Sequence, residues 1–106
     1  MKFLLKTDEF LLVSAQCYLK LKNFERTVKN CNEALQLDRK NVKALYRISM
    51  AHRYLQEYDQ ARYNLNLAIN IEPNNSEIIE EAQRLDRSIE QQKKNEKKLY
   101  YRMFNQ

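Results

Sequence analysis

The sequence predicts an all-α fold made of repeated helical hairpins, and three observations support this class. First, residues 8–41 align without a gap on residues 42–75. Second, the chain has no glycine and a single proline, whereas the turns between strands favour residues that adopt positive φ angles. Third, small and large apolar residues recur at the spacing of one helix face. Identical pairs in the alignment include Leu11/Leu45, Leu21/Leu55, Asn30/Asn64, Ala34/Ala68 and Asn41/Asn75.

Five helices account for the pattern. The first begins with the apolar residues at Phe3, and the second follows a short polar turn. Asn41 suits the N-cap of the third helix, because its side-chain oxygen can accept a hydrogen bond from the first turn. Polar residues separate the third helix from the fourth, and residues 73–76 (Pro-Asn-Asn-Ser) end the fourth and cap the fifth. The expected ranges are about 3–22, 24–37, 42–55, 58–71 and 77–104.

The charge and the termini limit the cellular setting. The net charge is +5, but basic and acidic residues alternate through most of the chain, as on a solvated surface. We therefore expect no nucleic-acid partner. The apolar run Phe3–Leu5 is too short for a signal peptide, and no stretch is long enough for a membrane span. A cytoplasmic protein is expected.

No arrangement of residues suggests catalysis, a cofactor or a metal site. Cys17 and Cys31 lie at apolar repeat positions without a nearby histidine, so both are expected to be buried thiols. His52 is the only histidine and aligns with Tyr18 of the other repeat, which favours a packing role. The absence of glycine also excludes a phosphate-binding loop. The chain is not expected to be an enzyme.

The period of about 34 residues is typical of tetratricopeptide repeats, in which pairs of antiparallel helices stack on their neighbours. We expect a single domain over residues 1–106, with repeats at 8–41 and 42–75 and a C-terminal helix at 76–104. Arrays of this kind present a concave groove to protein partners. The period therefore predicts a non-catalytic protein-interaction module.

The first helix is apolar on all sides near its start, whereas a helix with one neighbour needs one apolar stripe. Phe3, Leu4, Phe10 and Leu11 cannot all be covered by one following repeat. We therefore expect them to pack on another chain, so that the protein forms an assembly or a homo-oligomer. An upstream repeat, a partner or a second copy could each provide the cover.

The last helix has two apolar patches. The first is spaced for docking on the second repeat and consists of Ile78, Ala82, Leu85 and Ile89. The second lies among lysines and arginines and consists of Leu99, Tyr100, Met103 and Phe104. A basic amphipathic helix is a known form of calmodulin target and of membrane-surface segment. The second patch is therefore a candidate contact for calmodulin.

Three tracts carry a family resemblance: residues 42–47 (VKALYR), 57–61 (EYDQA) and the ending 96–104 (EKKLYYRMF). They resemble the tetratricopeptide tail of the large immunophilins. These are FK506-binding and cyclophilin-type prolyl isomerases that serve the ninety-kilodalton heat-shock chaperone. Residues 17–21 also resemble the middle repeat of that tail. The resemblance covers nearly the whole chain.

The resemblance implies a carboxylate clamp for the acidic C-terminal peptide of the chaperone. The lysine and arginine of the family's last repeat match Lys43 and Arg47. Four residues apart on one helix, both can reach a single peptide carboxylate. The asparagine of the middle repeat is replaced by Val13, which cannot hydrogen-bond through its side chain. The family's first repeat and its isomerase domain have no counterpart in this sequence.

Three functions remain open. The first is a co-chaperone adaptor whose peptide groove consists of Lys43, Tyr46, Arg47, Met50, Arg53 and Tyr54. The second is a structural subunit, packed into a larger assembly through its apolar N-terminal helix and its C-terminal helix. The third is the non-catalytic part of a tetratricopeptide-containing prolyl isomerase.

Overall fold

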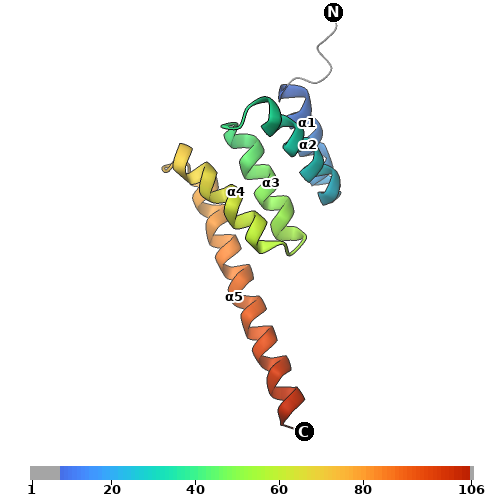
Figure 1. Ribbon diagram of the computed structural model, residues 1–106, viewed down its shortest axis with the longest axis vertical. Helices are drawn as coiled ribbons and strands as arrows, with labels where there is room; N and C mark the ends of the chain where they lie inside the picture. Colours follow the sequence, from blue (N-terminus) through green and yellow to red (C-terminus); the bar gives the residue numbers. More distant parts are fainter. Residues whose placement is uncertain (1–7, 106) are drawn as a thin grey trace, which may run out of the picture.

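The computed structural model describes residues 8–105, and these residues form helices without any strand. The helices are α1 (Asp8–Lys20), α2 (Phe24–Leu37), α3 (Val42–Tyr54), α4 (Tyr58–Ile71) and α5 (Ser76–Phe104) (Figure 1). Two antiparallel hairpins, α1–α2 and α3–α4, stack on each other, and α5 packs against α3 and α4. The predicted all-α class of stacked helical hairpins is confirmed.

Asparagine side chains fix three of the helix starts. The Oδ1 atom of Asn23 accepts a hydrogen bond from the amide of Arg26 at 3.2 Å. Asn41 does the same for the amide of Ala44 at 3.1 Å, as the sequence predicts. Asn75 accepts from the first turn of α5. Each bond satisfies a backbone donor that has no partner within its own helix.

The turns inside the two hairpins share an unusual backbone. Lys22 has φ 61° and Gln56 has φ 62°, so both lie in the left-handed region that glycine occupies most readily. The two residues hold equivalent places in the two repeats. The chain therefore repeats one turn conformation without using glycine in either copy.

The main core lies where α5 meets the second hairpin. It consists of Leu45, Ala61, Leu65, Ala68, Ile78 and Leu85, each at most 1% exposed. Ala82 and Ile89 pack partly against it, so the first apolar patch of α5 docks as the sequence predicts. Removing this much apolar surface from water is the main favourable contribution to docking.

An ion pair joins α3 to α5 at the edge of this core. Nε of Arg53 donates to Oε2 of Glu81 at 2.5 Å, and Nη2 donates to Oε1 at 3.2 Å. The side chain of Glu81 is only 1% exposed and that of Arg53 is 12% exposed. Arg84 also contacts the Glu81 carboxylate, at 3.5 Å. The carboxylate is therefore buried but well paired.

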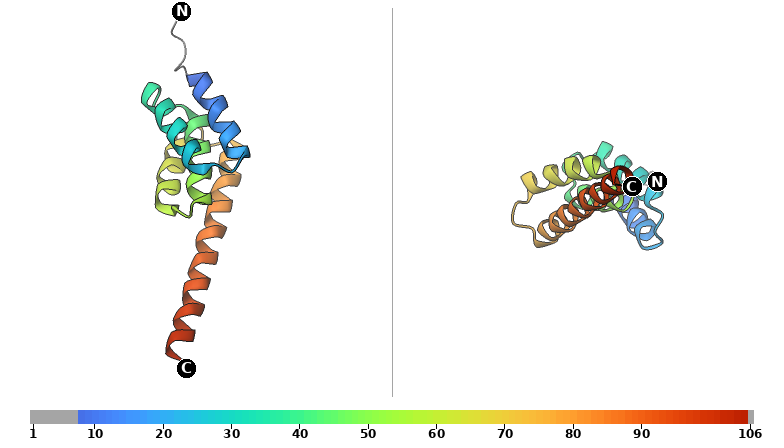
Figure 2. Two further views of the ribbon diagram at one scale, coloured as in Figure 1. Left: turned by 90° about the vertical axis from the view of Figure 1, so that its right-hand side faces the viewer. Right: turned by 90° about the horizontal axis from the view of Figure 1, so that it is seen from below.

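The second half of α5 projects beyond the rest of the molecule. Figures 1 and 2 show it leaving the stacked hairpins as a single helix, in red, which extends the molecule to 67 × 28 × 20 Å. Residues 90–105 are all exposed. None of the helices in the described range is both long and apolar enough to cross a membrane.

The apolar N-terminal helix differs in part from the prediction. Phe3 and Leu4 lie outside the described residues. Leu11 is 3% exposed and packs with Leu12, Ala34 and Ala44 of its own chain, so its assignment to a partner-facing patch is wrong. The second hairpin covers this side of α1, because α3 lies across both helices of the first. Phe10 is 55% exposed.

The prediction of two buried thiols is wrong for Cys17, which is exposed, and right for Cys31. Cys17 aligns with Ala51 of the second repeat, and Ala51 is fully buried. The difference follows from position in the stack. Helix α3 has described helices on both sides, whereas α1 contacts only α2 and α3.

We expect the Glu81→Ala variant to lose about 3 kcal/mol of unfolding free energy, because the change leaves Arg53 partly buried without its partner. Urea denaturation followed by circular dichroism measures the loss. Glu90→Ala, at an exposed position on the same helix, is the control and should change stability by about 0.5 kcal/mol or less. Equal losses in the two variants would contradict the assignment.

We expect one reactive thiol in the folded protein. Burial raises the pKa of Cys31 from 9.0 to about 12, and nearby Arg47 only partly offsets this, so the thiol stays protonated at pH 8. A chromogenic disulfide reagent at pH 8 should therefore modify Cys17 rapidly and Cys31 only after denaturation. The Cys17→Ser variant should show no rapid reaction. Two thiols reacting at the same rate in the native protein would refute the burial of Cys31.

Candidate binding groove

Helices α1, α3 and α5 are the first helices of successive structural units, and polar contacts link each to the next. Between α1 and α3, Arg47 donates from Nη1 to the backbone carbonyl of Leu12 and from Nη2 to Oε1 of Gln16, each at 3.1 Å. Between α3 and α5, Arg53 binds Glu81. We call this side of the molecule the α1–α3–α5 face.

The predicted groove residues lie along α3 but differ in their exposure and in their contacts with other side chains. Lys43 is exposed and has no hydrogen bond or ion pair in the described part of the chain. Arg47 is held by α1. Met50 is half-buried. Tyr46 packs partly against the main core. Of the two predicted clamp residues, Lys43 is thus an exposed cation without a partner in the described range, and Arg47 is a cation oriented by its contacts with α1.

Tyr46 lies near two carboxylates of α5, and their negative charge affects its pKa. Burial raises the pKa of Tyr46, and the Glu81 and Glu77 carboxylates raise it further, while Arg84 opposes them by charge and by a hydrogen bond. Both carboxylates belong to α5. The first turns of α5 thus bring acidic groups to the face, in contrast to the basic residues of α3.

At the far end of α3, the predicted residues Arg53 and Tyr54 are tied into the fold. The guanidinium of Arg53 lies 4.5 Å from the ring centroid of Tyr54, which stacks on Phe24 at 4.7 Å with an interplanar angle of 4°. Burial alone would lower the pKa of Arg53, but hydrogen bonding and charge from Glu81, with a smaller contribution from Tyr54, raise it above its usual value. Arg53 therefore stays charged and fixed in place.

The sequence analysis gave no role to Gln16, Glu81 or Arg84, which the structure places in contacts between the helices of this face. Glu81 did carry a signal, because it falls three residues after Ile78 and therefore within the apolar stripe that docks α5. An acid at such a position indicates a buried partner of opposite charge. The other two residues lie on helix surfaces, and nothing in their sequence surroundings separates them from solvated polar residues.

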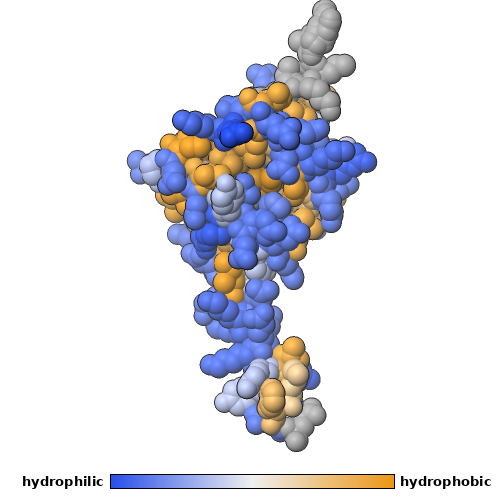
Figure 3. Space-filling model, viewed as in Figure 1, coloured by the Kyte–Doolittle hydropathy of each residue, from blue (hydrophilic) through white to orange (hydrophobic). Residues whose placement is uncertain are grey.

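The second apolar patch of α5 is exposed, as a binding surface must be. Its members Leu99, Tyr100, Met103 and Phe104 are between 56% and 67% exposed. Figure 3 shows this patch at the lower end of the molecule, separated from the hairpins by a hydrophilic stretch. Tyr100 and Phe104 contact each other with ring centroids 4.6 Å apart. The described residues include no cluster of histidine, cysteine or acidic side chains suited to a metal.

Comparisons with known sequences agree with this architecture. The family described as "Tetratricopeptide repeat" matches residues 8–41 and 42–75. The peptidyl-prolyl cis-trans isomerase FKBP4 of Bos taurus is 37% identical over 90 residues, which cover 85% of this chain and 20% of that protein. The chain thus spans about a fifth of the length of this relative. The resemblance to the tetratricopeptide region of immunophilins is confirmed.

Solved structures give the same result. The Hsp90 co-chaperone Cns1 from Saccharomyces cerevisiae superposes with a TM-score of 0.84 at 31% identity, covering 91% of this chain and 31% of that one. The first repeat domain of Spaghetti (RPAP3) bound to the HSP90 peptide SRMEEVD has a TM-score of 0.75 at 27% identity, covering 79% and 67%. The second such domain of human RPAP3, in complex with the HSP70 peptide SGPTIEEVD, has a TM-score of 0.73 at 25% identity. The match covers 76% of this chain and 68% of that one. This chain belongs to the tetratricopeptide repeat family of protein-interaction modules.

Proposed function

We propose that the chain is a co-chaperone adaptor that binds the acidic C-terminal peptide of a heat-shock chaperone on the α1–α3–α5 face. The observation that carries this proposal is the pair of cations on α3, Lys43 and Arg47. One has no partner among the described residues and the other is oriented across the face. Two of the similar solved domains hold chaperone peptides that end in EEVD.

The contacts of Arg47 leave it able to bind a carboxylate. A guanidinium has five N–H donors, and the bonds to Leu12 and Gln16 use two of them. Because these bonds hold the side chain in place, less conformational entropy is lost when a peptide binds. Lys43 supplies a second positive charge one helical turn away. In this proposal Arg47 orients the bound carboxylate and Lys43 supplies additional positive charge.

The clamp differs from the family pattern on α1. Val13 is 62% exposed at the position where the family has an asparagine. It follows Leu12, whose backbone carbonyl accepts a hydrogen bond from Arg47. A valine can contact an aliphatic peptide side chain but cannot donate a hydrogen bond to the peptide. We therefore propose a clamp that depends on charge more than the family pattern does, with binding that weakens as salt increases.

The proposed role is binding without catalysis, in the cytoplasm. The relative's name is that of an isomerase, but the match covers about a fifth of it and falls on interaction repeats. Two free cysteines, of which Cys17 is exposed, suit a reducing compartment.

We expect Lys43→Ala to weaken binding of the peptide SRMEEVD about tenfold and Lys43→Ala with Arg47→Ala to abolish it, because each removes charge-assisted hydrogen bonds. Val13→Asn should tighten binding about fivefold. Isothermal titration calorimetry measures the three affinities, and circular dichroism checks that each variant folds. Lys98→Ala, on the projecting half of α5, is the control. An unchanged affinity in the double variant would exclude the clamp.

A second candidate function concerns the exposed end of α5. Leu99 and Met103 lie on one side of this helix among basic residues, in a part that packs on nothing else described. We propose that this end binds a protein groove of calmodulin type, which takes basic amphipathic helices. The same patch would serve the alternative role of a subunit contact in an oligomer or larger assembly.

We expect calcium-loaded calmodulin to bind the chain, and Leu99→Glu with Met103→Glu to abolish binding by placing charges on the apolar side. Sedimentation velocity with and without calcium measures the complex. Lys94→Gln, on the same exposed half of α5, is the control and should have little effect. Lack of calcium-dependent binding would exclude calmodulin, and sedimentation of the chain alone as a dimer would favour the assembly role.

A further inference from the structure

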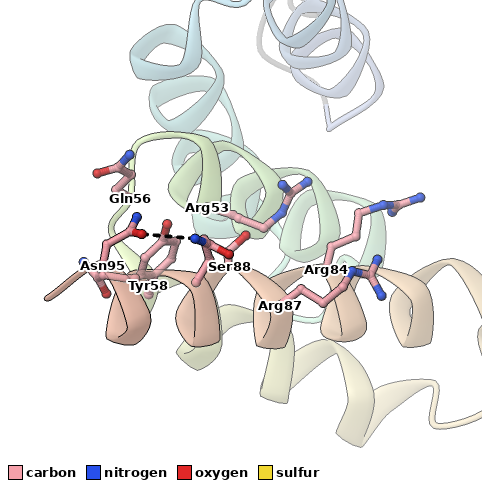
Figure 4. A pocket seen from close by; sticks show the side chains of 9 residues that line it. Arg53, Gln56, Tyr58, Arg84, Arg87, Ser88 and Asn95 are labelled. Atoms are coloured by element: carbon pink, nitrogen blue, oxygen red, sulfur yellow. Dashed lines mark hydrogen bonds between the residues drawn. The ribbon is translucent and has the colours of Figure 1, made fainter. Parts of the chain in front are cut away.

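A hollow of about 550 Å³ lies where the end of α3 and the start of α4 face α5. None of the sequence motifs points to it. Its lining comes from both ends of the α3–α4 turn and from about three turns of α5. The lining residues are Arg53, Gln56, Tyr58, Arg84, Arg87, Ser88, Gln91, Gln92 and Asn95. Figure 4 shows the three arginines toward one end of the hollow, with Gln56, Tyr58 and Asn95 toward the other.

The lining is basic and contains no acidic residue. Of the three arginines, Arg53 is paired with the buried carboxylate of Glu81. Arg84 contacts the same carboxylate and lies 3.9 Å from Glu80, on the surface of α5. Arg87 is exposed and has no ion pair or hydrogen bond within the described residues. The hollow therefore holds more positive charge than its neighbouring carboxylates balance.

The neutral groups of the hollow are also hydrogen-bond donors. The hydroxyl groups of Ser88 and Tyr58 and the side-chain amides line the remaining wall. Gln91 donates to Asn95 at 3.1 Å, which holds these two amides in one arrangement. A phosphate group carries a charge close to −2 at neutral pH and three acceptor oxygens, and arginine clusters are its usual recognition element. The charge and the three acceptor oxygens of a phosphate therefore match this lining of several donors better than a single carboxylate does.

We propose that the hollow binds the phosphate of a phosphorylated serine or threonine within the peptide whose C-terminal carboxylate is held by Lys43 and Arg47. This inference rests on the proposed function. Arg87 supplies the free charge, and Arg84 and Arg53 supply further donors from fixed positions. Phosphorylation of the partner thus adds a second point of attachment on the same face.

The geometry of α3 predicts where the phosphate must lie in the peptide. Lys43 and Arg53 are on the same helix, and a rise of 1.5 Å per residue places their backbones about 15 Å apart. An extended peptide spans at most about 3.3–3.6 Å per residue. The phosphorylated residue must therefore be followed by at least about five residues. The threonine of SGPTIEEVD, the peptide bound to the similar human domain, meets this requirement.

The test uses the full chain and the nonapeptide SGPTIEEVD with its threonine either unmodified or phosphorylated. Calorimetry should show that the phosphorylated peptide binds about tenfold more tightly, which is the usual effect of one additional charge-assisted contact. Arg87→Gln should remove this gain and leave the affinity for the unmodified peptide unchanged. Ser88→Glu, which adds a negative charge to the hollow, should make the phosphorylated peptide the weaker ligand. Lys98→Gln, on α5 outside the hollow, should retain the gain.

Two further measurements separate this proposal from the one it rests on. If the phosphorylated peptide binds through Arg87 but is unaffected by Lys43→Ala with Arg47→Ala, the clamp is wrong and the phosphate site stands. If the unmodified peptide binds through the clamp and the phosphorylated one binds no better, the phosphate site is wrong and the clamp stands. Failure of both peptides to bind would overturn both proposals.

Discussion

The buried ion pair between Arg53 and Glu81 is the interaction on which the binding face depends. It fixes the register of α5 against α3, because either charge left unpaired in this position would be strongly unfavourable. Arg47 performs the matching task on the other side of α3, through neutral partners on α1. One helix therefore carries both polar connections. The basic hollow is lined by α3 and α5, the two helices that this ion pair joins.

The sequence predicted the elements of the fold well, because the repeat supplies the same local signals twice. The alignment of residues 8–41 on 42–75 gives the helix pairs, and the N-cap at Asn41 gives a boundary. The stripe that contains Ile78 and Leu85 predicted the docking of α5. These signals are local or periodic, so they need no knowledge of how the helices cross.

The sequence predicted the candidate site less completely, because the pairing of side chains between helices depends on the packing register. Arg53 and Glu81 are 28 residues apart, and no local pattern indicates that they meet. Cys17 and Leu11 show the same limit for burial. The repeat pattern identified both as apolar positions, but only the stacking order decides that Leu11 is covered and Cys17 is exposed. The sequence did not indicate that Arg84 and Arg87 line one hollow with Arg53, because this depends on how α5 packs against α3.

The projecting half of α5 has a consequence for helix formation itself. A free helix of this length is marginal in water, since its first turn must be nucleated at a large entropic cost. The docked half of α5 is already helical and supplies that nucleus, so the exposed residues only extend an existing helix. Detachment of the docked half would therefore also unwind the apolar and basic end, roughly 20 Å away along the helix axis. The helical structure of the projecting half of α5 therefore depends on the packing of its first half against α3 and α4.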